Sequence, residues 1–343
     1  MRNSSIELYR IIAMLFVVIV HCNGWLVGGL PGDFDETNIS AFRISQATIQ
    51  AITCTCVNMF LLISGYFGLK LKLKSILNIY MLLISISIPF YLLSVYLGGT
   101  FSIRQFLSRF MAFSRSGYFV ECYLLLMFFS PVLNAFIDKL GKKILLWVLL
   151  FWGIEIYFEF YLHDKDLGFM GGYSFIHFML IYMIGRTLYL YKEQLFAISK
   201  KRYFTCYILS TLTILCLYTI FDIYAYSYCS PFNVIATCSL FMIFAKTTYY
   251  NRWINWVASS TFAVYIIHTS NPVFNWLRNF DKEALTNYEY PSYLLTMGGV
   301  ILLIFVGSII YDKIAKIVTV PIVSYLDRTI QKISKKQAIF LEP

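Results

Sequence analysis

The chain has 343 residues, of which 59% are hydrophobic and only 13% are charged. A soluble domain would carry roughly 25% charged residues, so most of this chain must face lipid or the interior of a helical bundle. The formal net charge of +10 would suggest nucleic-acid binding in a soluble protein. Here the basic residues stand between apolar runs, where membrane topology explains them, so we expect no nucleic-acid partner.

The apolar runs predict a polytopic all-α bundle. A membrane helix needs roughly 20 mostly apolar residues, and about ten runs reach that length. In chain order they lie near Glu7–Gly28, Thr48–Gly68, Ile76–Leu97, Tyr118–Ile137, Ile144–Leu162, Gly172–Tyr191, Tyr203–Tyr224, Pro231–Tyr250, Ala258–Leu277 and Ser292–Lys313. No duplicated motif or low-complexity linker divides them, so we expect one domain over residues 1–343 that ends in a basic cytoplasmic tail, 314–343.

Loop charges predict the orientation, because lysine and arginine concentrate in cytoplasmic loops. The basic residues follow every second run: Lys70, Lys72, Lys74, Lys139, Lys142, Lys143, Arg186, Lys192, Lys200, Lys201, Arg202, Lys246, Arg252 and the tail from Lys316. The opposite loops carry mainly acidic residues: Asp33, Asp35, Glu36, Asp164, Asp166, Asp222, Asp281, Glu283 and Glu289. Both termini are therefore expected in the cytoplasm.

One loop departs from this rule. Arg104, Arg109 and Arg115 lie between the third and fourth runs, on the predicted outer side. The segment Ser102–Phe113 alternates them with apolar residues, a pattern typical of an interfacial amphipathic helix. Such a helix either anchors the chain to anionic headgroups or forms a basic lip that attracts an anionic acceptor.

The first run carries the strongest chemical signal. Ser4 and Glu7 have capping-box spacing, which predicts that the helix begins there. Arg10 then lies near the cytoplasmic boundary, and His21 follows eleven residues later. Eleven residues at about 100° and 1.5 Å each return to the same helix face and separate the two side chains by roughly 16 Å.

An ionisable side chain as deep in the bilayer as His21 is a functional hypothesis by default, although a neutral imidazole bonded to a neighbouring helix is the structural alternative. The arginine at the inner mouth can hold an anion, and the neutral histidine can accept a proton. Their separation is comparable to the pantetheine arm of coenzyme A.

An arginine, ten residues and then a histidine in the first membrane helix resemble the motif of the acyltransferase-3 family. Other segments are similar to that family in the same order: Glu7–Met14, Phe60–Tyr66, Tyr118–Tyr123 with Ser130-Pro131, Tyr182–Arg186 and Ser260–His268. The resemblance therefore covers nearly the whole chain, and it implies an enzyme.

The resemblance implies a membrane O-acyltransferase, most simply an O-acetyltransferase, in the bacterial inner membrane. The donor substrate would be a cytoplasmic acyl-CoA, usually acetyl-CoA, and the acceptor a sugar hydroxyl of a cell-surface glycan or lipid-linked sugar. His21 would act as general base for direct transfer, and an acetyl-histidine intermediate stays possible. The alternative is a glycan or lipid-linked-sugar transporter or flippase, whose helices are often interrupted at matched positions of two repeats. Pro89, Pro131 and Pro272 form no matched pair.

Further ionisable residues are candidates on the outer side. His268 matches the family's histidine in the ninth helix and serves either the active site or an interhelical bond. Glu121 either orients His21 or pairs with Arg115. His177 is a weaker candidate, and His163 is expected to be solvated in a loop. Glu155 and Glu159, one turn apart, either line an acceptor cleft or face water.

On the cytoplasmic side, coenzyme A needs cations for its phosphates. Lys70, Lys72, Lys74 and Arg186 are the candidates, with topology as the alternative explanation for each. We expect no metal, because the spacing of the eight cysteines matches no zinc pattern and neither G-x-S-x-G nor H-E-x-x-H occurs.

Overall fold

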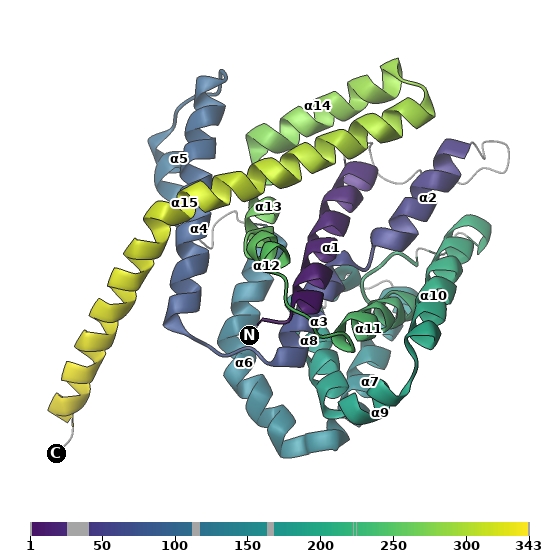
Figure 1. Ribbon diagram of the computed structural model, residues 1–343, viewed down its shortest axis with the longest axis horizontal. Coiled ribbons are helices and arrows are strands. Elements are labelled where there is room, and N and C mark those ends of the chain that lie inside the picture. The colour runs from purple at the N-terminus through teal and green to yellow at the C-terminus, as the bar shows by residue number, and fades with distance from the viewer. Residues whose placement is uncertain are drawn as a thin grey trace.

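The computed structural model describes residues 2–25, 41–111, 117–162, 168–221, 223 and 225–341. Every regular element in these ranges is a helix, which confirms the predicted all-α fold class. The α-helices are α1 Ser4–Val20, α2 Ala41–Thr53, α3 Cys56–Phe67, α4 Leu73–Tyr96, α5 Ile103–Ser108, α6 Tyr118–Leu140, α7 Ile144–Ile156, α8 Phe175–Leu190, α9 Lys192–Ala197, α10 Lys200–Phe221, α11 Pro231–Ala245, α12 Arg252–Ala258, α13 Thr261–His268, α14 Asn271–Asn287 and α15 Tyr290–Leu341 (Figure 1).

Six helical stretches within the described ranges are long and apolar enough to cross a membrane. They are Ser4–Asn23, Ile44–Phe67, Leu73–Tyr96, Tyr118–Leu162, Lys200–Phe221 and Pro291–Ile333. The chain is thus a multi-pass membrane protein. The predicted count of about ten differs because α6 and α7, joined by the 3-10 turn Gly141–Lys143, form one stretch, whereas α8 and α11 are apolar but have only 16 and 15 residues. The ten spans and their orientation stay predictions.

The ninth predicted run, Ala258–Leu277, is not one helix. It is divided among α12, α13 and α14. The second break precedes Pro272, which stands in the first turn of α14 and has no N–H with which to continue the helical ladder. The breaks matter because they leave His268 as the last residue of the short α13.

Both terminal helices also differ from the prediction. Asn3, rather than Ser4, caps α1, and its side chain accepts from the Ser5 backbone N–H at 3.1 Å. The last helix, expected to end near Lys313, continues to Leu341 and lies diagonally across α4 and α13 (Figure 1).

Helix α1 lies inside the bundle and packs against α3, α12 and α13. Side chains near its N-terminus anchor it: the Ser4 hydroxyl donates to Asn255 Oδ1 at 2.9 Å, and the Ser5 hydroxyl donates to the Phe244 carbonyl at 2.8 Å. Tyr9 is fully buried. These contacts fix the axial position of the helix that carries Arg10 and His21.

Two glycines allow α3 and α8 to approach closely. A Cβ on Gly65 would lie 2.2 Å from the Tyr182 carbonyl oxygen, and a Cβ on Gly185 would lie 2.7 Å from that of Leu62. Small residues permit such backbone contact between membrane helices. The crossing therefore requires glycine at both positions.

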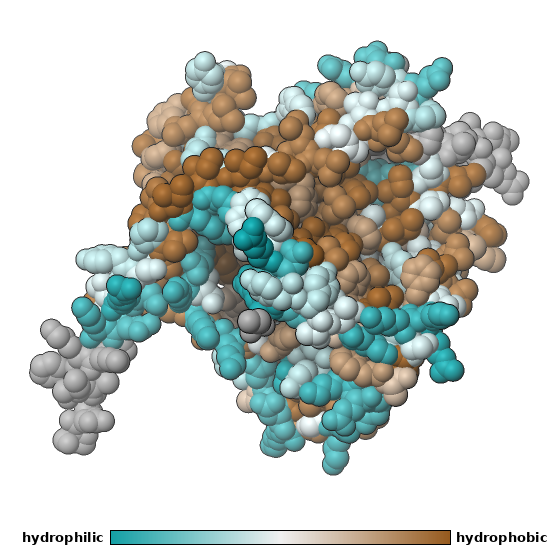
Figure 2. Space-filling view, in the orientation of Figure 1, coloured by the Kyte–Doolittle hydropathy of each residue, from teal (hydrophilic) through white to brown (hydrophobic). Residues whose placement is uncertain are grey.

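The surface is divided by polarity in the way that a bilayer requires. Figure 2 shows hydrophobic side chains in a broad band across the middle of this face, with hydrophilic ones gathered at the lower end and a smaller hydrophilic group at the upper edge. Leu146 and Leu150 on α7 are largely exposed. In a bilayer such apolar side chains face lipid instead of water.

Candidate active site

His21 and His268 come together at the C-terminal end of α1. His21 begins the π-helical turn His21–Trp25 that continues α1, and its Nδ1 lies 2.8 Å from Nε2 of His268. His268 is 1% exposed, whereas His21 is half-buried. The structure thus brings together two candidate residues that the sequence proposed separately.

Hydrogen bonding selects one tautomer for each ring. Nδ1 of His268 lies 2.6 Å from the Val264 carbonyl oxygen, which can only accept, so this nitrogen carries a proton. In neutral His268, Nε2 is then the acceptor, and His21 must donate to it from Nδ1. Neutral His21 therefore has its lone pair on Nε2, which makes this nitrogen the one that accepts a proton or attacks a carbonyl.

Arg10 lies on the same helix and is held by a carboxylate. Its Nη1 is 2.5 Å from Glu7 Oε2, and Arg2 Nε is 3.8 Å from Glu7 Oε1. Glu7 is buried, whereas the Arg10 side chain is 28% exposed. The capping-box spacing predicted a helix cap for Glu7 and not this pair, although the i,i+3 spacing was the available signal.

Arg186 lies near the C-terminal end of α8, the end that leads into α9 (Figure 1). Its side chain is only 16% exposed, with Nη2 at 4.0 Å from Asp138 and the guanidinium over the Tyr189 ring. Its Nε is buried and has no hydrogen-bond partner among the described residues. A buried donor of this kind is satisfied when an anion binds beside it.

Two of the three candidate lysines, Lys70 and Lys72, lie in the connection from α3 to α4, and Lys74 stands in the first turn of α4. Lys70, Lys72 and Lys74 are all exposed. The connection begins at Gly68, where a Cβ would lie 3.3 Å from Arg186 Nη1. The start of this connection, two residues before Lys70, therefore lies against Arg186.

Glu121 is not joined to either histidine. It lies half-buried in the first turn of α6, and it makes no hydrogen bond or ion pair with a described residue. Arg115, its predicted alternative partner, lies outside the described residues, as does His163. The role of Glu121 as an orienting group for His21 stays a prediction without a contact to support it.

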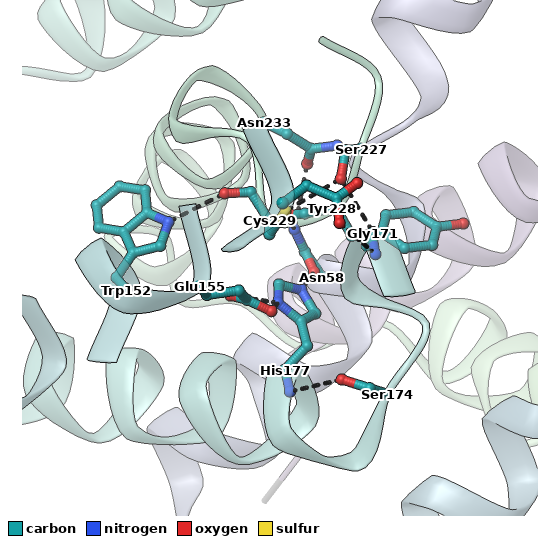
Figure 3. A network of polar contacts seen from close by, with 11 residues as sticks. Asn58, Trp152, Glu155, Gly171, Ser174, His177, Ser227, Tyr228, Cys229 and Asn233 are labelled. Atoms are coloured by element: carbon teal, nitrogen blue, oxygen red, sulfur yellow. Dashed lines mark hydrogen bonds and ion pairs between the residues drawn. The ribbon is translucent and has the colours of Figure 1, made fainter. Parts of the chain in front are cut away.

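His177 and Glu155 form a buried pair that the sequence patterns did not predict (Figure 3). His177 Nδ1 lies 2.9 Å from Glu155 Oε1, and His177 Nε2 lies 2.8 Å from Asn58 Oδ1. Both members of the pair are almost completely buried, at 0% and 1% exposure. Glu155 therefore neither faces water nor lines a cleft, and His177 is engaged on both nitrogens.

The proton positions in this network follow from its backbone acceptors. Asn233 Nδ2 donates to the Cys54 and Tyr226 carbonyls, so Asn233 Oδ1 accepts from Asn58 Nδ2. Asn58 Oδ1 must then accept from His177 Nε2. A second proton lies between His177 Nδ1 and Glu155, and the pair as a whole is neutral. The network ties α3, α7, α8 and α11 together.

Glu159 has a different partner from Glu155. Its Oε2 accepts from the Gly171 backbone N–H at 2.8 Å. Gly171 has φ of +64°, a conformation that favours glycine. Glu159 therefore orders a turn of the connection between α7 and α8.

A cavity of about 480 Å³ opens beside the end of α13 that carries His268, although neither His268 nor His21 is among the residues that line it. Tyr265 and Thr269, which precede and follow His268 on the chain, are both part of its wall. The Tyr265 ring also contacts the His268 ring, with 5.9 Å between centroids. A substrate in this cavity would therefore reach the surroundings of His268.

The family model described as an acyltransferase domain matches residues 3–312. No curated protein and no solved structure matched the chain. The matched range includes Arg10, His21, Arg186 and His268, and it extends over most of the helical bundle. The chain therefore belongs to the acyltransferase-3 family and is a multi-pass membrane acyltransferase.

Proposed function

We propose that the chain transfers an acyl group, most simply acetyl, from a cytoplasmic acyl-CoA to a sugar hydroxyl of a cell-surface glycan or lipid-linked sugar. The observation that carries the proposal is the pair of His21 with His268 on a helix that also bears Arg10. The proposed location is the bacterial inner membrane.

The acyl-CoA donor approaches from the cytoplasm, at the end of the helical bundle that carries the basic residues. Arg186, whose buried Nε has no hydrogen-bond partner among the described residues, supplies a cation for the phosphates of coenzyme A, and the exposed Lys70, Lys72 and Lys74 supply others. The pantetheine arm then runs along α1 past Arg10 toward His21, a separation of roughly 16 Å for a regular helix.

The transfer step uses His21 as general base. Nε2 of His21 takes the proton of the acceptor hydroxyl while the hydroxyl oxygen attacks the thioester carbonyl carbon. The new C–O bond forms, the C–S bond breaks, and the thiolate recovers the proton from the His21 imidazolium. Throughout, His268 Nε2 accepts from His21 Nδ1, which orients the ring and stabilises its positive charge.

The same tautomer permits a two-step route, in which Nε2 attacks the thioester carbonyl carbon and the C–S bond breaks, so that coenzyme A leaves as the thiolate. The acceptor oxygen then attacks the acetyl-histidine, the bond from Nε2 to the acetyl carbon breaks, and the hydroxyl proton passes to the thiolate. The two routes differ in one measurable way. Incubation with labelled acetyl-CoA in the absence of acceptor leaves label on the protein only when the acetyl-histidine forms.

The proposal is tested by measuring acetyl ester on surface glycan in cells that carry wild type, His21→Ala or Arg10→Ala, at equal membrane levels. Lys201→Ala, an exposed residue of α10, is the control. We expect His21→Ala to lower acetylation by about 10²-fold or more, since general-base catalysis contributes about 10²–10⁴-fold, and the glycan to be made and exported normally. Unchanged acetylation together with failed export would support the transporter alternative instead.

A further inference from the structure

The cavity beside His268 lies between α4, the α5 segment and the break between α13 and α14. Phe90 and Tyr91 of α4 form one wall, and Tyr118 and Tyr265 contribute two further rings. Hydroxyl and amide side chains fill the spaces between them: Ser87, Ser94, Thr100, Gln105, Thr269 and Asn271. Rings that offer a flat apolar face, combined with neutral donors and acceptors, suit a polyhydroxylated ring.

Arg109 is the one charged residue among the described residues that line the cavity. Its guanidinium carbon lies 5.2 Å from the centroid of the Tyr91 ring, so the aromatic face supports the cation. A guanidinium presents a planar set of donors that fits a carboxylate or phosphate. Among the described residues, Arg109 is therefore the charged group that this wall offers to an anion.

The position of Arg109 is fixed by the attachment of the α5 segment to α4. The Tyr91 hydroxyl accepts from the Ser102 N–H at 2.8 Å and donates to the Ser102 carbonyl at 3.0 Å. The Tyr80 hydroxyl donates to the Phe110 carbonyl at 3.0 Å. Phe106 packs on Tyr91. The segment is therefore held at both ends and presents Arg109 in a defined place.

Other residues of the α5 segment are exposed on its surface and do not line the cavity as Arg109 does. Ile103 and Leu107 are exposed, which fits the predicted contact with the membrane interface, and Arg104 is also exposed and outside the cavity wall. The segment thus has two faces, one exposed at Ile103, Arg104 and Leu107 and one that places Arg109 in the cavity wall. Arg104 provides a matched control for Arg109.

Two backbone features add to the positive potential. The N-termini of α6 and α14 reach the cavity through Gly117 and Asn271, and helix N-termini favour negative charge. Glu121, one turn into α6, opposes this effect but is not part of the wall. Gly117 has φ of +87° and approaches the Tyr265 hydroxyl, so a larger residue there would both strain the backbone and narrow the cavity.

We propose that this cavity is the acceptor subsite and that the acceptor carries a carboxylate or phosphate, which Arg109 binds while the sugar hydroxyl reaches His21. This inference rests on the proposed function and narrows its acceptor to acidic glycans. Arg109 is a specificity residue that touches the acceptor, and it takes no part in the proton transfer.

The test uses membranes that contain the full chain, labelled acetyl-CoA and the endogenous glycan. The labelled unit is isolated and its acidic groups are identified by mass spectrometry, which also distinguishes a uronic acid from a phosphate. Arg109→Gln, Arg109→Lys and Arg104→Gln are then compared with wild type. We expect Arg109→Gln to raise the KM for the glycan about tenfold or more, with the KM for acetyl-CoA unchanged, and Arg109→Lys to recover part of the loss.

The outcomes separate the two proposals. A labelled unit with neither carboxylate nor phosphate on the acylated sugar or its neighbour overturns the inference and leaves the acyltransferase function intact. Equal effects of Arg109→Gln and Arg104→Gln on the KM for the glycan also overturn it. No label on any glycan in wild type overturns both proposals.

Discussion

Nδ1 of His21 lies 2.8 Å from Nε2 of His268, although 247 residues separate them in the chain. The Val264 carbonyl fixes the tautomer of His268, and His268 in turn fixes that of His21. This relay resembles the arrangement in which a fixed acceptor orients a catalytic imidazole, except that the acceptor is a second imidazole.

Removing the acceptor on His268 should impair catalysis by His21 without affecting donor binding. In His268→Leu, Nδ1–H of His21 loses its acceptor, so we expect kcat to fall by about 10²-fold with the KM for acyl-CoA unchanged. His268→Gln should recover part of kcat, because its side-chain oxygen can accept. Steady-state kinetics on purified protein measure kcat and KM. An equal loss of kcat in His268→Leu and His268→Gln would contradict a positioning role for His268.

Arg186 should contribute to coenzyme A binding. We expect Arg186→Gln to raise the Kd for coenzyme A about tenfold, because a charge-assisted hydrogen bond is lost. Ligand-dependent thermal stabilisation in detergent measures this change. Arg202→Gln, an exposed arginine of α10, is the control, and the same Kd shift in both variants would argue for bulk electrostatics instead of a site.

The His177–Glu155 pair should stabilise the fold. Removing one partner of a buried pair costs about 3–5 kcal/mol, so Glu155→Leu and His177→Leu should each lower the free energy of unfolding strongly. The double variant should lose less than the sum of the two. Denaturant unfolding in detergent provides the three values, with the exposed Glu193→Gln as control. Strict additivity would show that the two side chains do not interact.

The crossing of α3 and α8 should tolerate no added Cβ at Gly65. A Cβ at 2.2 Å from the Tyr182 carbonyl must displace one helix, and overpacking of this kind costs about 1–3 kcal/mol or more. Gly153→Ala in α7 is the matched control, since no described atom outside the backbone of its own helix lies within 4 Å of its Cβ position. The folded fraction of Gly65→Ala after size-exclusion chromatography is the readout, and recovery equal to that of Gly153→Ala would contradict a close backbone contact at this crossing.

Local patterns in the sequence were sufficient to predict a membrane protein and to place two of its candidate site residues on one helix. Apolar runs and sparse charge indicate membrane helices because lipid contact requires them. The spacing of Arg10 and His21 places both on one helix because helical pitch depends only on neighbouring residues. A local pattern can also mislead. The spacing of Ser4 and Glu7 fits a capping box, whereas in the structure Glu7 pairs with Arg10.

Contacts between helices were decided only by the tertiary structure. The sequence proposed His268 as a candidate but not its bond to His21. It named His177 and Glu155 separately and gave no signal for Asn58. These side chains meet because α1, α3, α7, α8 and α13 pack at particular depths and rotations. Such packing depends on the shapes of many side chains at once, including the glycines at the α3–α8 crossing, and no local periodicity encodes it.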